Sequence, residues 1–136
     1  MTEPRYLLDT NICIYIRQER PERVLRRFLK LRPGEAVLSV ITYGELLYGA
    51  AKSARRTAAL ERLRELVRLL PAMALPESAA ETYGAMRAEL ESKGEMIGNN
   101  DLWIAAHALA AGLTLVTNNE KEFRRVRGLK VQNWAR

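Results

Sequence analysis

Cysteine and histidine are nearly missing from this 136-residue sequence, which contains one of each, Cys13 and His107. A single cysteine forms no intramolecular disulfide, and one Cys and one His cannot make up the usual ligand set of a structural zinc site. Cys13 lies in an apolar stretch, so we expect it to be a small buried hydrophobic residue. The scarcity of cysteine is typical of a reducing compartment, and we expect a cytoplasmic location.

Long hydrophobic runs are missing as well. No stretch approaches the ~18 to 20 apolar residues that a membrane span requires, and the first residues lack the features of a secretory signal. We therefore expect a chain that neither crosses a membrane nor is exported. Because ~100 to 200 residues per domain is usual, residues 1–136 are predicted to form a single domain.

Three common catalytic motifs are also absent. The sequence contains no GxSxG, no HExxH and no Gly-rich phosphate loop, which leaves serine hydrolase, zincin and P-loop chemistry without support. The two tryptophans, Trp103 and Trp134, are interpreted as core residues rather than as platforms for stacked bases.

Basic residues, by contrast, are abundant. The chain has 22 Lys and Arg against 16 Asp and Glu, a formal net charge of +6, and 17 of the basic residues are Arg. Arginine makes bidentate contacts with phosphate, so a nucleic-acid partner is compatible with this composition. A solvated basic surface explains the charge equally simply, so position must add to composition.

Short apolar runs alternate with helical patterns along the chain. This alternation is typical of an α/β sandwich with a largely parallel sheet, here of four or five strands. Strands are predicted at 6–8, 36–40, 113–117 and 130–132, with a weaker one at 73–75. Helices are predicted at 12–18, 21–31, 41–51, 55–70, 77–93, 101–111 and 120–126.

Three segments are almost free of charge, although charged residues make up 28% of the chain. Residues 6–16 contain only Asp9, residues 36–51 only Glu45, and residues 96–119 only Asp101 when histidine is counted as neutral. None of these segments contains Lys or Arg, so a buried carboxylate in them needs another source of compensation. A shared Mg²⁺ or Mn²⁺ ion would provide it, because hard cations prefer oxygen ligands and keep clustered carboxylates ionised.

Each acid also has an ordinary explanation. Asp9 could cap a helix that begins near Thr10, and Asp101 could lie at the positive N-terminus of a helix capped by a preceding asparagine. Glu45 could be a half-exposed helix residue. His107 lies off the helix face that Asp101 occupies, so we interpret it as a packing or hydrogen-bonding residue rather than as a general base.

Four stretches of the sequence, compared together, resemble a known family. In chain order they are LLDTNI, SVITYGEL, IGNNDLWIAAHA and LVTNNEKEF. Together they are similar to the PIN-domain ribonucleases, specifically the VapC toxins of type II toxin-antitoxin pairs. The resemblance covers nearly the whole chain and implies a three-layer α/β/α fold. It also implies that Asp9, Glu45 and Asp101 bind Mg²⁺ or Mn²⁺ at a site that hydrolyses a phosphodiester bond in RNA.

The resemblance further implies auxiliary residues. Many relatives have another acid after the last core strand in a Thr-x-Asp context, whereas this chain has Thr117 followed by two asparagines. Asn119 is the candidate replacement, as a residue that positions water or substrate, and Glu122 matches an acid that some relatives use near the site. Thr10 and Thr117 are expected to support the acids or to position a phosphate through their hydroxyl groups.

The implied partners are the RNA substrate and a VapB-type antitoxin whose tail occupies the acidic groove. A homodimer, and a heterotetramer or larger assembly with the antitoxin, is implied as well. The candidates for contacts with the RNA backbone are the basic residues of two stretches, 17–27 and 121–127.

Two other interpretations belong to different classes of protein. A metal-binding receiver of the phosphoacceptor type would need an acidic pair near Asp9 and a lysine directly after residues 113–117, and the sequence has neither. A nucleic-acid-binding module without catalysis would use the arginine surface alone, which leaves the three isolated acids unexplained.

Overall fold

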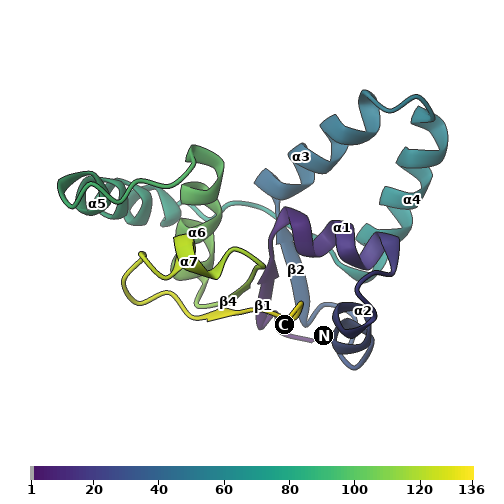
Figure 1. The fold of residues 1–136 in the computed structure, drawn as a ribbon, viewed down its shortest axis with the longest axis horizontal. Helices are drawn as coiled ribbons and strands as arrows, with labels where there is room; N and C mark the ends of the chain where they lie inside the picture. The colour runs from purple at the N-terminus through teal and green to yellow at the C-terminus, as the bar shows by residue number, and fades with distance from the viewer. Residues whose placement is uncertain (1) are drawn as a thin grey trace.

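The apolar run at residues 6–8 forms β1 (Tyr6–Leu8), the central strand of a five-stranded sheet (Figure 1). The structure is a computed structural model and describes residues 2–136. All strand pairs are parallel, in the order β3-β2-β1-β4-β5. The other strands are β2 (Ala36–Ser39), β3 (Ala72–Met73), β4 (Thr114–Val116) and β5 (Val131–Gln132).

Seven helices connect the strands within residues 2–136, in the predicted element order. Observed and predicted boundaries differ by no more than three residues, and the largest difference is at the last helix. None of the helices that the structure describes combines the length and the apolar character that a membrane crossing requires. The helices are α1 (Thr10–Gln18), α2 (Glu22–Leu29), α3 (Val40–Ala51), α4 (Arg56–Leu69), α5 (Ala79–Ser92), α6 (Asn99–Ala111) and α7 (Glu120–Phe123).

Side chains that alternate across the strands build one core on each face of the sheet. Leu7, Val37 and Leu115 point to the face covered by α5, α6 and α7. Leu8 and Leu38 point to the opposite face, which is covered by α1, α2, α3 and α4. Figure 1 shows the sheet between these two groups of helices. The three-layer α/β/α fold is therefore confirmed, with a sheet that is entirely parallel.

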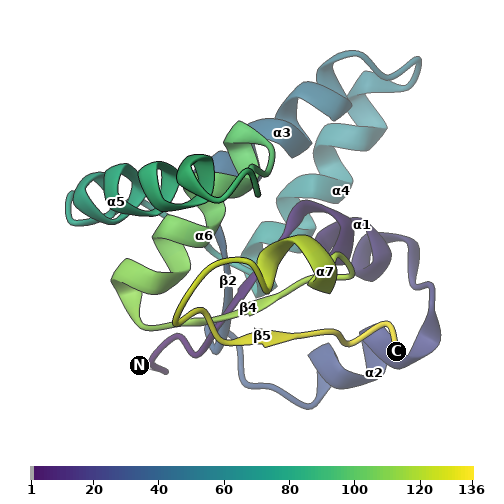
Figure 2. The ribbon, with the colours of Figure 1, turned by 60° about the vertical axis from the view of Figure 1, so that its left-hand side comes forward.

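The carboxyl ends of the three central strands meet at one edge of the sheet. Leu8 pairs in register with Val116, so the residues that follow them, Asp9 and Thr117, emerge side by side. The third central strand ends at Ser39, where α3 begins. Figures 1 and 2 show α3 and α4 as neighbouring helices that project beyond the sheet. This edge is where parallel α/β folds bind their ligands.

Candidate active site

Asp9 lies at the junction of β1 and α1, and it caps the helix. Its Oδ1 accepts the backbone N–H of Ile12 at 3.0 Å, so α1 begins at Thr10, two residues before the predicted start. Its Oδ2 accepts a hydrogen bond from the hydroxyl of Thr117. The capping explanation of Asp9 is therefore correct, but it accounts for one carboxylate oxygen only.

Only 6% of Asp9 is exposed, and this burial raises the pKa of its carboxyl to about 6. The hydrogen bonds from Thr117 and Ile12 act in the opposite direction, because they favour the charged form. The negative charges of Asp101 and Glu45 raise the pKa further, which places all three acids within electrostatic reach of one another.

Asp101 lies in the first turn of α6 and is half-buried. Burial raises the pKa of its carboxyl, and the charges of Glu122 and Glu45 add to the increase. The predicted asparagine cap is wrong, because the N-cap is Gly98, which has no side chain to accept a bond. Asn99 instead accepts a hydrogen bond from the hydroxyl of Tyr83 at 2.6 Å.

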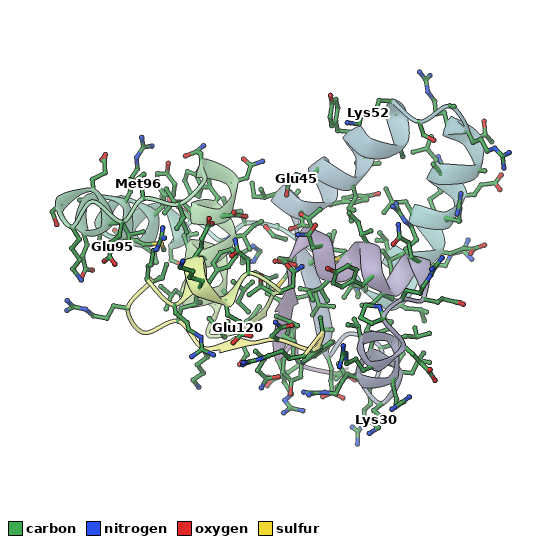
Figure 3. The ribbon with its side chains drawn as sticks, viewed as in Figure 1. Lys30, Glu45, Lys52, Glu95, Met96 and Glu120 are labelled. Carbon is green, nitrogen blue, oxygen red and sulfur yellow. The ribbon has the colours of Figure 1, made fainter. Side chains whose placement is uncertain are left out.

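Glu45 lies near the middle of α3 and is labelled in Figure 3. It is half-buried, as expected for a half-exposed helix residue, but its side chain also forms a hydrogen bond at the site. Its Oε1 accepts the hydroxyl of Thr10 at 2.7 Å. Thr10 opens α1 directly after Asp9, so this bond joins the helix that follows β1 to the helix that follows β2.

Thr117, which follows β4, and Glu122 on α7 bring these two elements to the acids. The hydroxyl of Thr117 donates to Asp9 and accepts the backbone N–H of Asn119 at 2.9 Å. Asn119 is half-buried and is the N-cap residue of α7, which also carries Glu122. Glu122 is near enough to Asp101 to raise its pKa. The structure thus brings all the predicted auxiliary residues to the same edge of the sheet.

Two polar residues at this edge were missed in the sequence. Ser39 is fully buried; it caps α3 by accepting the N–H of Ile41 at 3.2 Å. Asn118 donates to the hydroxyl of Tyr15 at 2.8 Å and ties the loop after β4 to α1. Both lie at the carboxyl end of a predicted strand, and that position is the signal that identifies them.

The acids at this edge have no ion-pair partner within the part of the chain that the structure describes, since none of its ion pairs includes Asp9, Glu45, Asp101 or Glu122. The same part of the chain contains no group of three or more Asp, Glu, His or Cys side chains gathered closely enough to hold a metal ion by themselves. The acids therefore repel one another across the edge of the sheet without forming a closed metal cage.

Several interpretations of other side chains can be checked directly. His107 is fully buried, its Nδ1 is hydrogen-bonded to Ser39 at 2.9 Å, and burial lowers its pKa, which confirms a hydrogen-bonding role. Cys13 is fully buried, as predicted. Trp134 lies in the core, whereas Trp103 is half-buried and stacks on Tyr83 at 3.8 Å, so the core interpretation was correct for Trp134 only.

A parallel sheet between two helical layers, with acids gathered at its carboxyl edge, defines a PIN-like α/β/α protein. A family model described as "PIN domain" matches residues 6–129. Ribonuclease VapC2 from Haemophilus influenzae is 41% identical over 131 residues, which cover 96% of this chain and 98% of that protein. The tRNA(fMet)-specific endonuclease VapC from Shigella flexneri is 39% identical, with the same coverage of each chain.

Solved structures show the same relationship. VapBC2 from Rickettsia felis, bound to a DNA fragment from its promoter, matches with a TM-score of 0.89 and 38% identity over 98% of this chain and 99% of that one. DNA-bound VapBC from Salmonella typhimurium matches with a TM-score of 0.90 and 37% identity over 96% and 98%. The chain therefore belongs to the PIN-domain family and, within it, to the VapC proteins. A receiver of the phosphoacceptor type has no support.

Proposed function

We propose that this protein is a metal-dependent endoribonuclease and the toxin of a toxin-antitoxin pair. The observation that carries the proposal is the set of acids Asp9, Glu45 and Asp101 at the carboxyl edge of the sheet, where burial and neighbouring negative charges raise the pKa of Asp9 and Asp101 and no ion pair within residues 2–136 includes any of the three. Relatives at 38 to 41% identity are named as ribonucleases or endonucleases, which supports RNA as the substrate class.

The donor set fits Mg²⁺ or Mn²⁺. All candidate ligands are carboxylate oxygens. Burial raises the pKa of Asp9 and Asp101, the charges of neighbouring acids raise it further, and a divalent cation would relieve that repulsion. Asp9, Glu45 and Asp101 would hold the ion, with Glu122 beside them. Mg²⁺ commonly binds through one or two carboxylates together with water and substrate phosphate oxygens, so a preformed cage of three side chains is not required.

A bound divalent cation would supply Lewis-acid polarisation of the phosphate and a water of lowered pKa. The protein's own contribution is to hold the acids in place. Thr117 donates to Asp9 and Thr10 donates to Glu45, and these bonds set the orientation of the two carboxylates. His107 is fully buried, so proton transfer at the phosphate is assigned to the carboxylates and water rather than to an imidazole.

Relatives also suggest a substrate and a partner. The Shigella flexneri and Salmonella typhimurium proteins are named as tRNA(fMet)-specific, so transfer RNA is the first substrate to test. The matching structures are VapBC complexes, and a VapB-type antitoxin is therefore the proposed partner, in a homodimer-based heterotetramer or a larger assembly.

A cleavage assay on transfer RNA tests the proposed activity. We expect cleavage with Mg²⁺ or Mn²⁺, loss of cleavage in chelator, and a decrease of about 10²- to 10⁴-fold in Asp101→Asn, the range for a positioned catalytic group. Glu95→Gln removes the same charge from an exposed residue that Figure 3 shows well away from Glu45, and it keeps full activity. Full activity of a folded Asp101→Asn protein would refute the acidic site.

The toxin role is tested by expression in bacteria. Wild-type protein arrests growth, Asp101→Asn does not, and co-expression of the cognate antitoxin restores growth. Normal growth during high expression of catalytically active protein contradicts the toxin assignment.

A further inference from the structure

A cavity of about 250 Å³ lies beside Glu45, between α1, α3 and α4. Its volume is just below the range of about 300–1,000 Å³ that is usual for small-molecule sites, so it has room for part of a nucleotide. The residues that give the cavity its polar character are Thr10, Arg17, Gln18, Glu45, Ser53 and Arg62.

Two arginines give this cavity its positive charge. Arg17 is half-buried in the last turn of α1, and Arg62 is exposed on α4. Neither takes part in an ion pair with any residue of the 2–136 range. Arg17 belongs to one of the basic stretches singled out in the sequence, where Arg26 pairs with Glu22; in the other stretch, Arg124 pairs with Glu120. The two guanidinium groups beside the acidic site are therefore available for an anionic ligand.

A second cavity lies on the other side of Glu45. It measures about 710 Å³ and is lined by Tyr48, Lys52 and Asn100, among others. The two cavities share Thr10, Glu45 and Gly49, and a side-chain carbon added at Gly49 would meet no atom within 4 Å. Both cavities therefore border Glu45, and a polynucleotide bound across this acid would contact the lining of both.

We propose that Arg17 and Arg62 bind the RNA phosphate adjacent to the phosphate that is cleaved. This inference rests on the proposed ribonuclease function. Planar guanidinium groups donate paired hydrogen bonds to phosphate oxygens, and two of them outweigh the single charge of Glu45, which is already hydrogen-bonded to Thr10. Arg17 and Arg62 are binding residues, and they place the neighbouring phosphodiester over the acids.

Binding of a short fluorescein-labelled single-stranded RNA to Asp101→Asn protein, which does not cut it, tests the subsite by anisotropy. We expect Arg17→Gln and Arg62→Gln each to weaken binding roughly tenfold, and the double variant to reduce the slope of log K against log salt by about 0.7, the value for one single-strand phosphate contact. Arg64→Gln is the matched control, because Arg64 is exposed on another face of α4, and it keeps nearly wild-type binding.

Neutral methylphosphonate linkages locate the contact. The cleavage site is first mapped with the wild-type protein. We expect a single methylphosphonate linkage next to that site to lower the affinity as Arg62→Gln does. In the Arg17→Gln, Arg62→Gln double variant, the same linkage is expected to cause no further loss of affinity. Equal losses at every linkage, or binding by Arg17→Gln and Arg62→Gln that matches Arg64→Gln, would overturn the subsite while wild-type cleavage persists. Failure of the proposed function is a different result, namely no metal-dependent cleavage by the wild-type protein.

Discussion

Asp9 combines two roles that have opposite effects on stability. As the cap of α1 it accepts the N–H of Ile12, which stabilises the start of the helix. As a buried carboxylate near Asp101 and Glu45 it is disfavoured in its charged form. An increase of its pKa from 3.8 to about 6 corresponds to about 3 kcal/mol at 1.36 kcal/mol per pKa unit. The acidic site therefore destabilises the metal-free fold near neutral pH.

Asp9→Asn is predicted to stabilise the metal-free protein in a way that depends on pH. Because the folded pKa lies above the unfolded value, the folded state binds the proton more tightly, and wild-type stability rises as pH falls through about 6 towards 4. The amide keeps an oxygen for Ile12 and does not titrate. We expect the variant to be more stable than wild type by up to about 3 kcal/mol at pH 7.5, and by much less near pH 4.

Urea unfolding in chelator at several pH values measures this difference. The same variant is expected to lose RNA cleavage, since Asp9 is one of the proposed metal ligands. A variant that is less stable than wild type across the whole pH range would show that the cap and the Thr117 bond outweigh the burial of the charge.

At the scale of secondary-structure elements, one hydrogen bond links the helices that carry two of the acids. Ser39 caps α3, which carries Glu45, and it is bonded to His107 of α6, which carries Asp101. Both residues are fully buried. The lowered pKa of His107 keeps its imidazole neutral, so the link does not place a charge in the core. This bond sets the position of α3 relative to α6.

A double-mutant cycle tests the link between Ser39 and His107. Ser39→Ala removes the cap and is expected to lower stability by about 1–2 kcal/mol. His107→Leu is expected to lower the free energy of unfolding by less than a typical core substitution does. It also removes Nε2, a buried atom that has no hydrogen-bond partner among residues 2–136. We expect a coupling energy of about 1 kcal/mol in urea unfolding. Strictly additive effects would mean that the two side chains are neighbours without an effective bond.

At the scale of the whole molecule, two cores lie on opposite faces of one sheet. Leu7 and Leu8 are neighbours in β1, yet they belong to different cores. Neither core closes without the sheet that both share, so they are expected to unfold together. The chain is therefore predicted to behave as a single domain.

Each face of the sheet has one tryptophan to report on it. Trp134 lies in the core against Tyr6, and Trp103 lies on α6 on the other face. In Trp103→Phe and in Trp134→Phe, fluorescence follows the remaining tryptophan, and its urea midpoint is expected to coincide with that of far-ultraviolet circular dichroism. Separate midpoints for the two probes within one variant would show two folding units.

Much of the fold was predictable from local patterns. Apolar runs and helical periodicity are properties of neighbouring residues, so the element order and the α/β class followed from them. The ends of elements depend on capping contacts, which explains the start of α1 at Asp9 and the replacement of an asparagine cap by Gly98 on α6. Of the acids, Asp9, Glu45 and Asp101 were identifiable because their segments contain no other charge.

The sequence by itself determined which stretches become strands or helices and which acids lack a local cation, because these properties depend on short spans of chain. Only the tertiary structure decided which of them meet. Asp9 and Thr117 are 108 residues apart and Ser39 and His107 are 68 apart, and both pairs are hydrogen-bonded because the strand order places β1 between β2 and β4. Arg62 and Arg17 both lie beside Glu45 because of how α1, α3 and α4 pack, and the packing of distant segments is likewise a property of the tertiary structure.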